Sequence, residues 1–330
     1  MPRARGRFAA TIAFALTAQL SIAAVQAATG VENNSISIPR IDGSHLTVDV
    51  VKPSVATKMP IILAIGGSIC MPTNASEQIA KLSPATSGAI PYALVIVETP
   101  DPTIPPRSED GSINIGPDFR CSDEFKKRYS IDERVMDHLR AIQYLRRRAP
   151  WWNGQLLVWG FSDGGRIGAR VAAFSPETTR VVLGGFGGGV PMAQEFEDFH
   201  MCNSVRTGDQ ADCIAKVRAQ FDEMRANPTS AQTWNGDSNT YKAWVSRIDS
   251  VEANVLHDLS APLLLIHGAE DHSVPVSSAR ALAKLLSTAD GPSFQYLEIP
   301  GMSHGLGAGL SKVQSDDLQA KVLRWLLVGE

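Results

Sequence analysis

The sequence predicts an α/β fold in which a mostly parallel β-sheet is covered by helices on both faces. Short, almost wholly apolar segments rich in Val, Ile and Leu recur along the chain, as is typical of strands buried on both faces. Segments with helical spacing of apolar residues lie between several of them. Strands and helices that alternate in this way place functional groups where the strands end, at the carboxyl edge of the sheet.

The hydrophobic pattern gives the positions of these elements. The first two strands, residues 35–39 and 45–51, flank the turn pair Asp42-Gly43 and are expected to form an antiparallel hairpin. The other strands are expected at residues 60–65, 92–97, 156–159, 181–183, 263–266 and 294–299. The main helices are expected at residues 131–148, 164–174, 277–286 and 316–327.

Two stretches interrupt the alternation. Residues 98–129 are rich in proline and polar side chains, and residues 187–259 are too long for a plain connection between two elements. Helical patterns at 211–225 and 241–255 indicate that the second stretch is a small cap over the sheet edge rather than an independent domain. A single domain over residues 28–330, with the cap inserted at about 187–259, is therefore predicted.

The first residues differ from the rest of the chain. Arg3, Arg5 and Arg7 precede an apolar run, and small residues around Ala27 follow it. This layout predicts a cleaved signal peptide over residues 1–27 and a periplasmic or secreted protein without stable membrane insertion. The alternative is an uncleaved membrane anchor, because the apolar run nearly reaches spanning length.

Composition excludes some classes of partner. The chain has 330 residues, of which 44% are hydrophobic and 20% charged, so it has enough apolar material for one large core. Its formal net charge is -3, with no basic stripe for a phosphate backbone. Nucleic-acid binding is therefore not expected, and the sequence does not indicate an oligomeric state.

The four cysteines are an even number, which in an exported protein favours disulfides over metal ligands or a thiol nucleophile. Cys202 and Cys213 lie close together in one segment, so a local bridge between them is expected. That pairing leaves Cys70 to bond with Cys121. Four buried free thiols are the alternative.

A serine sits in the pattern of a catalytic nucleophile. The apolar strand ending at Trp159 runs into Gly160-Phe161-Ser162-Asp163-Gly164, and a helix begins near Arg166. This GxSxG turn between strand and helix is the nucleophile elbow, in which small residues on both sides of the serine prevent clashes. An incidental serine in a tight turn is the structural alternative.

A serine hydroxyl needs a base and an orienting carboxylate, and both follow in the chain. Asp271 lies in the loop after the strand at 263–266, with Glu270 as the rival carboxylate. His304 follows the last strand among small residues that let its ring reach across the sheet edge. The chain order Ser162, Asp271, His304 selects His304 from the seven histidines.

The reaction also needs backbone donors for a developing oxyanion. The strand at 60–65 ends in Gly66-Gly67-Ser68-Ile69-Cys70, and we expect the amide of Ser68 or Ile69 to act together with that of Asp163. Gly66 and Gly67 as ordinary turn glycines are the alternative.

With these motifs the chain resembles the α/β-hydrolase superfamily, and its GFSDGG, HGAEDHSVP and GMSHG segments look like the dienelactone-hydrolase and prolyl-oligopeptidase-like branch. The resemblance implies an eight-stranded sheet in which the strands ending near Gly66 and Val97 are neighbours. It also implies that Cys70 and Cys121 meet at one edge. The chain departs from common members in having Gly66-Gly67-Ser68 where many carry His-Gly.

These residues predict a serine hydrolase that cleaves a carboxylic ester, thioester or lactone through an acyl-enzyme, without a metal or organic cofactor. An exopeptidase or amidase, in which cap carboxylates hold an amino group, is one alternative, and a catalytically silent binding protein is another. The cap contains aromatic and acidic residues, which we interpret as cap core with a solvated face rather than an aromatic pocket rimmed by acid: Phe196, Phe199, Trp234, Tyr241, Trp244, Glu195, Glu197 and Asp198.

Overall fold

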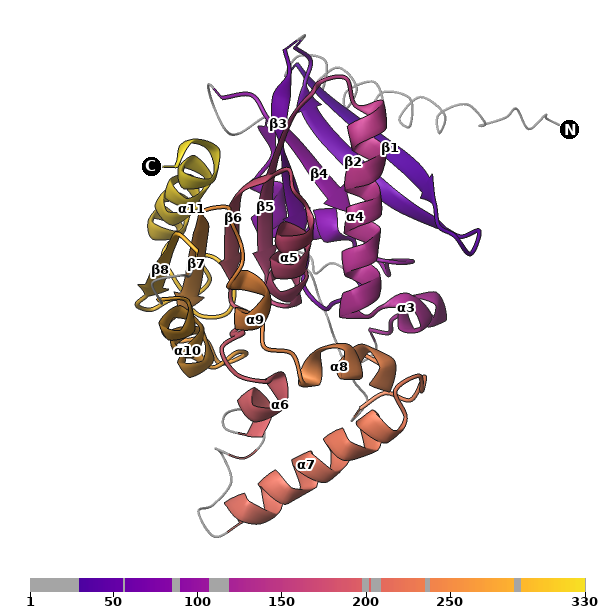
Figure 1. Ribbon diagram of the computed structural model, residues 1–330, viewed down its shortest axis with the longest axis vertical. Helices are drawn as coiled ribbons and strands as arrows, with labels where there is room; N and C mark the ends of the chain where they lie inside the picture. Colours follow the sequence, from indigo (N-terminus) through magenta and orange to yellow (C-terminus); the bar gives the residue numbers. More distant parts are fainter. Residues whose placement is uncertain are drawn as a thin grey trace, which may run out of the picture.

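The computed structural model describes residues 30–55, 57–84, 90–106, 119–197, 202, 209–234, 238–287 and 292–329. One eight-stranded sheet runs through the molecule in the order β1-β2-β4-β3-β5-β6-β7-β8. Helices lie on both of its faces, and a group of further helices lies beyond one end of the strands (Figure 1). The proposed signal peptide falls outside the described residues.

The strands are β1 (Val31–Pro39), β2 (His45–Pro53), β3 (Met59–Ile65), β4 (Ala93–Val97), β5 (Trp152–Phe161), β6 (Thr178–Gly184), β7 (Leu263–Gly268) and β8 (Phe294–Ile299). The helices that accompany the sheet are α2 (Glu77–Ala80), α3 (Asp123–Arg128), α4 (Ile131–Arg148), α5 (Asp163–Phe174), α10 (Val276–Leu286) and α11 (Lys312–Val328), with the short 3-10 helix η1 (Thr73–Ala75). Between β6 and β7 lie α6 (Met192–Glu195), α7 (Gln210–Ala226), α8 (Tyr241–Ile248) and α9 (Ala253–Leu256).

The pairing of the strands confirms the predicted fold class. β1 and β2 form the expected antiparallel hairpin, and β2 pairs antiparallel with β4. The other neighbours, from β4 through β3 and β5 to β8, are parallel. β3 therefore lies between β4 and β5, so the loops after all three strands open at one edge of the sheet.

Side chains of each central strand alternate between two cores, because successive residues of a strand point to opposite faces. In β3, Ile61, Leu63 and Ile65 pack in the core beneath α4, α5, α9 and α10. Ile62 and Ala64 pack in the other core, which α2 and α11 cover. Burial on both faces explains why these strands are continuous apolar runs in the sequence.

Three elements differ from the sequence-based expectation. The nucleophile strand β5 begins at Trp152, because its first residues pair in parallel with the start of β3. A short helix, α3, lies in the proline-rich stretch, where the Ser122 hydroxyl caps it by accepting from the Phe125 amide. The single helix expected at 241–255 is two helices, α8 and α9, because the chain turns at Asp249, whose carboxylate binds Arg225 of α7.

The cap, residues 187–259, has a small core of its own. Figure 1 shows α6, α7 and α8 beyond the carboxyl ends of the strands, with α9 beside α5. The cap core is built mainly from aromatic rings that contact each other edge to face or at a tilt: Phe196, Phe221, Trp234 and Trp244. Within the described residues, none of the helices combines the length and hydropathy needed to span a bilayer.

Both disulfides expected from the cysteine spacing are present. Cys202 and Cys213 form a local bridge in the cap. Cys70, in the loop after β3, bonds to Cys121, which lies just before α3. This second bridge is buried in a small cluster with Phe125 and Tyr129, and it ties the loop after β3 to the segment just before α3.

Candidate active site

Ser162 lies on the turn between β5 and α5 in a strained backbone conformation. Its φ is 58° and its ψ is -133°, a region that residues other than glycine rarely adopt. The turn is held on both sides: the Ser162 amide donates to Gly184 O at 3.0 Å, and the Gly165 amide donates to Ser162 O at 2.8 Å. The geometry exposes the side chain at the strand end, as a nucleophile elbow requires.

The elbow glycines are sterically required. A Cβ atom at Gly160 would lie 2.1 Å from Gly164 O, and one at Gly164 would lie 2.3 Å from Ile65 O. Either contact is far inside van der Waals range, so no larger residue fits without moving the backbone. These glycines thus allow β3, β5 and the start of α5 to meet at the serine.

His304 is held beside the elbow by Asp271. The His304 Nδ1 and the Asp271 Oδ2 are 3.0 Å apart, which is a hydrogen bond from the imidazole to the carboxylate. The His304 side chain is 31% exposed and lines the same cavity as Ser162, whereas the Asp271 carboxylate is buried. Because Nδ1 bonds to the carboxylate, Nε2 is the ring nitrogen that can accept a proton.

The structure separates the two rival carboxylates. Glu270 is exposed, whereas Asp271 accepts the amides of Ser273 and Val274 on Oδ1 at 2.8 and 2.9 Å. Burial raises the pKa of Asp271. The hydrogen bond and charge of His304 and the two backbone amides lower it by more, so the net pKa is below its ordinary value. Asp271 is therefore an ionised partner for the imidazole.

Ser68 and Ile69, the residues expected to supply an oxyanion donor, reach the cavity that holds Ser162. A cavity of about 310 Å³ is lined by both residues, by Ser162 and by His304. A Cβ atom on neighbouring Gly67 would lie only 3.4 Å from the Ser162 Cβ, so the loop after β3 passes directly beside the serine. Asp163 begins α5 at the same place. The loop after β3 and the start of α5 therefore both lie next to Ser162.

The rest of this cavity combines apolar walls with a polar rim. Ile65, Ile79, Trp159 and Phe161 supply apolar surface, and Ser76 and Gln78 supply polar groups. The Gln78 side chain passes close to the residue after the histidine, since a Cβ atom on Gly305 would lie 2.3 Å from its Nε2. Sequence reasoning missed Gln78 because α2 is a short helix without a distinctive pattern.

Buried ion pairs attach the cap to the elbow helix. Arg166 of α5 donates to Glu195 Oε2 at 2.7 Å and to Glu252 Oε2 at 2.5 Å, and all three side chains are at most 2% exposed. Ser278 also donates to Glu195, at 2.6 Å. Glu195 therefore does not face a substrate. Glu197 pairs with Arg218, and Phe199 and Asp198 lie outside the described residues.

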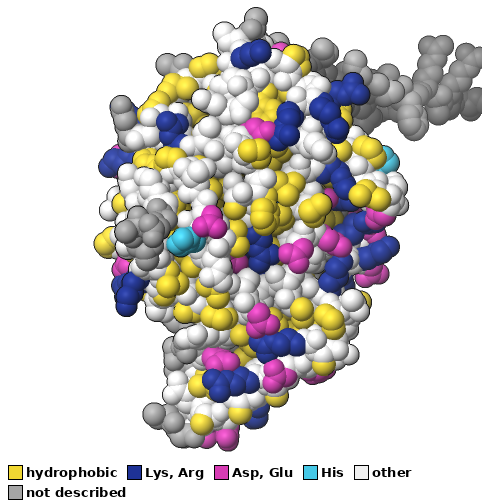
Figure 2. All heavy atoms as spheres, in the orientation of Figure 1, with side chains coloured by type: hydrophobic (Ala, Val, Ile, Leu, Met, Phe, Trp, Pro, Cys, Tyr) yellow, Lys and Arg dark blue, Asp and Glu magenta, His cyan; other side chains and the backbone are white. Residues whose placement is uncertain are grey.

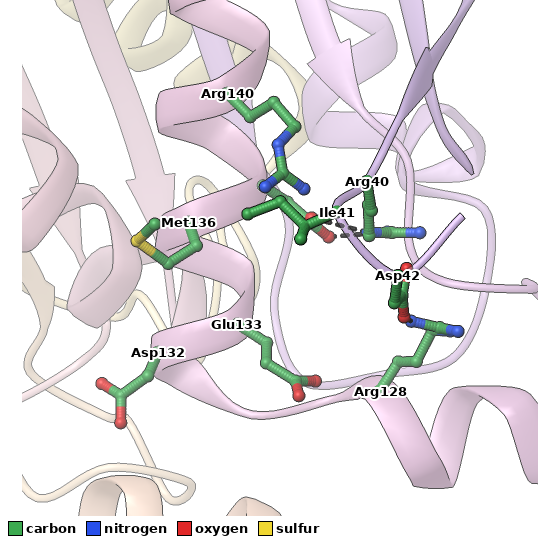
Figure 3. A pocket seen from close by; sticks show the side chains of 9 residues that line it. Arg40, Ile41, Asp42, Arg128, Asp132, Glu133, Met136 and Arg140 are labelled. Atoms are coloured by element: carbon green, nitrogen blue, oxygen red, sulfur yellow. Dashed lines mark hydrogen bonds and ion pairs between the residues drawn. The ribbon is translucent and has the colours of Figure 1, made fainter. Parts of the chain in front are cut away.

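A second cavity, of about 380 Å³, lies away from the serine between the turn after β1 and the start of α4. Figure 3 shows Arg128 beside Asp42 and the two dashed hydrogen bonds that Arg40 makes. Arg40 binds Asp137 through two hydrogen bonds of 2.8 and 2.7 Å, and Arg128 binds Asp42 at 2.7 Å. These pairs neutralise most of the lining, so we assign this cavity no chemistry.

Two further observations concern ligands. In the part of the chain that the structure describes, no group of three His, Cys, Asp or Glu side chains is arranged to hold a metal ion. On the face seen in Figure 2, Lys and Arg side chains are interspersed with Asp and Glu side chains, so charge of one sign does not gather there.

Comparison with known proteins gives a family match and a set of similar folds. The model of the prolyl oligopeptidase family matches residues 211–328, about a third of the chain. No curated protein sequence matches. Est1E from Butyrivibrio proteoclasticus is 14% identical, with a TM-score of 0.55 over 88% of this chain and 98% of its own. A Klebsiella pneumoniae protein assigned as a dienelactone hydrolase is 15% identical, with a TM-score of 0.56 over 90% and 98%.

A peptidase is equally similar. The Pyrococcus horikoshii acylaminoacyl peptidase is 17% identical and has a TM-score of 0.57 over 90% of this chain, which corresponds to 41% of that longer protein. The chain therefore has the α/β-hydrolase fold. The proteins that it resembles include a dienelactone hydrolase, an esterase and a peptidase, and the partial family match is to prolyl oligopeptidases.

Proposed function

We propose that this chain is a serine esterase in which Ser162 is the nucleophile, His304 the base and Asp271 the residue that orients the histidine. The observation that carries the proposal is the 3.0 Å hydrogen bond between His304 and the buried Asp271, at a cavity shared with an elbow serine. The chain order Ser162, Asp271, His304, with each residue after a strand end, is the order typical of the α/β-hydrolase triad and supports these roles.

The mechanism proceeds through an acyl-enzyme. His304 Nε2 takes the proton of the Ser162 hydroxyl as its oxygen attacks the ester carbonyl. The tetrahedral oxyanion is met by the Asp163 amide and by that of Ser68 or Ile69. The imidazolium then gives its proton to the leaving alcohol, and the C–O bond breaks. Water, deprotonated by His304, attacks the acyl carbon and restores the serine.

The size of the cavity supports a short acyl group, and the pairing of the cap carboxylates argues against an aminoacyl substrate. The cavity of about 310 Å³ is at the small end of ligand pockets, which span roughly 300–1,000 Å³. The exopeptidase alternative needs a free cap carboxylate for the substrate's amino group, but Glu195 binds Arg166 and Glu197 binds Arg218. The cap thus offers no unpaired carboxylate from either residue.

The test compares p-nitrophenyl butyrate with p-nitrophenyl palmitate and alanine p-nitroanilide, for the purified mature protein and for Ser162→Ala. We expect fast butyrate hydrolysis, slow hydrolysis of the other two, and loss of all turnover in the variant. Preferred cleavage of the anilide supports the peptidase alternative. No turnover together with no fluorophosphonate labelling of Ser162 overturns catalysis and supports the silent binding protein.

We also propose that the chain is exported. The arginines and apolar run at its beginning are typical of a signal peptide, and two disulfides are typical of an oxidising compartment. Expression in a bacterial host with the native leader, followed by fractionation and mass spectrometry, tests this. A periplasmic protein beginning at Ala28 is expected, and a full-length cytoplasmic or membrane-bound protein would contradict it.

A further inference from the structure

The residue after the nucleophile carries a carboxylate that is buried beside the place where an oxyanion forms. Asp163 supplies one of the proposed oxyanion donors through its backbone, yet its own side chain is charged and 5% exposed. A bare carboxylate here would repel the negative charge that develops in the transition state. Two side chains from outside the elbow, Tyr129 and Arg247, bind this carboxylate.

Tyr129 lies at the corner between α3 and α4 and touches both sides of the proposed oxyanion hole. Its hydroxyl donates to Asp163 Oδ2 at 3.3 Å and to Gly67 O at 3.4 Å, so one proton is shared between the elbow and the loop after β3. The ring stacks on Phe125 with centroids 4.8 Å apart. Burial, reinforced by the charge of Asp163, raises the pKa of Tyr129 above its ordinary value, so the hydroxyl stays protonated and remains a donor.

Arg247 comes from cap helix α8 and forms a buried ion pair with Asp163. Its guanidinium also lies over the Trp244 ring, 4.3 Å from the centroid. Its Nε and Nη2 have no hydrogen-bond partner among the described residues, so the carboxylate is the main anchor of this cation. α8 is itself fixed to the α3–α4 corner, where the Ile131 amide donates to Ser246 Oγ at 3.0 Å.

We propose that Tyr129 and Arg247 are positioning residues for the oxyanion hole, because they lock the Asp163 carboxylate and the Gly67 carbonyl into one frame. This inference rests on the proposed function. Tyr129 sets the spacing between the loop after β3 and the elbow, and therefore between the two backbone donors. Arg247 neutralises the only charged side chain at the elbow and makes the cap part of that frame.

Tyr129 and Arg247 are at most 2% exposed, so neither contacts the substrate. They act by holding in place the backbone amides that would bind the oxyanion. Their loss should misplace donors that act only in the transition state. The effect is therefore expected in kcat and in the affinity for a tetrahedral analogue, with KM little changed. A merely structural residue would instead change the folded fraction and leave the kinetics of folded molecules unaltered.

The first test is Tyr129→Phe, which keeps the ring and removes the hydroxyl. We expect kcat for p-nitrophenyl butyrate and affinity for an alkyl trifluoromethyl ketone each to fall about tenfold, since losing a whole oxyanion donor costs about 100-fold or more. Tyr92→Phe is the matched control, because Tyr92 is equally buried and its hydroxyl donates to Leu82 O at 2.8 Å, away from the elbow. It should lose stability without losing kcat.

The second test is a rescue. Arg247→Met leaves the buried Asp163 carboxylate without a counter-charge and should lower kcat about 100-fold. Adding Asp163→Asn removes that charge and should restore kcat to within about tenfold of the wild type. Wild-type kcat in folded Tyr129→Phe, or no rescue by Asp163→Asn in folded protein, would overturn the positioning role. Inactive wild-type protein would instead overturn the proposed function itself, so the two failures are distinguishable.

Discussion

The two disulfides close loops of very different length, which makes their removal a quantitative test of how this chain is stabilised. Cys70 and Cys121 are 51 residues apart, and Cys202 and Cys213 are 11 apart. A crosslink stabilises the fold by restricting the unfolded chain, and the effect grows with the logarithm of the loop length. Loop-closure entropy assigns about 4.1 kcal/mol to the first bridge and about 2.8 kcal/mol to the second.

The perturbation is the double substitution Cys70→Ala/Cys121→Ala, with Cys202→Ala/Cys213→Ala as the comparison within the same protein. The first variant should be less stable than the second by about 1.4 kcal/mol, the difference in loop-closure entropy. Urea unfolding followed by tryptophan fluorescence gives both free energies. Reduced wild-type protein should be less stable than either variant.

Kinetics add an independent readout, because only one bridge touches the candidate site. Cys70 follows Ser68 and Ile69 in the loop after β3, and its bridge packs in the same cluster as Tyr129. Loss of the Cys70–Cys121 bridge should therefore lower kcat as well as stability. Loss of the cap bridge should lower stability alone. Equal destabilisation by the two variants, or a larger effect of the cap bridge, would refute the loop-length reasoning.

Three further predictions follow from the buried charges. Asp271→Asn should reduce kcat by about 10³–10⁴-fold with little change in KM, because an amide cannot hold the same tautomer of His304. Steady-state kinetics measure this, and a loss of kcat below about tenfold would contradict the assigned role. Arg166→Met should destabilise the fold by about 3–5 kcal/mol, because it leaves two buried cap carboxylates without their cation. Urea unfolding measures this loss. Arg170→Met, which removes a more exposed arginine of the same helix, should destabilise the fold far less. Burial lowers the pKa of His138 from 6.5 to about 3, so the unfolded state binds the extra proton between these values and stability falls as the pH drops below 6.5, by roughly 3 kcal/mol at pH 4.5. In unfolding measured from pH 7 to 4, His138→Phe should lose that part of the pH dependence, and an unchanged slope would contradict the assignment.

The sheet could be predicted from the sequence because its central strands are buried on both faces. Each such strand is a short apolar run, and β5 is extended at its start, where it pairs with β3. The first two strands were predicted instead from the turn pair Asp42-Gly43. The pairing of the strands that end near Gly66 and Val97 was expected from the family resemblance, since hydrophobic periodicity contains no information on which strands pair. The break between α8 and α9 was missed because apolar spacing continues across it.

The candidate site was predictable to the extent that its residues follow strand ends. Ser162, Asp271 and His304 each come after a recognisable strand, and the structure places them at one sheet edge. Tyr129 and Arg247 were not predictable. They contact Asp163 across 34 and 84 residues of sequence, and an arginine in an amphipathic helix ordinarily indicates a solvated face. Contacts of this kind exist only once the cap has docked.

The buried ion pairs between cap and elbow helix also bear on how such enzymes diversify and can be engineered. An insertion between two adjacent parallel strands is an obvious place to exchange one lid for another and so alter substrate range. In this protein, a replacement cap would leave Arg166 without its two glutamates and Asp163 without its arginine. The cap and the first turn of α5 therefore depend on each other's charged side chains. A chimera that keeps these ion pairs must exchange the cap and this turn together.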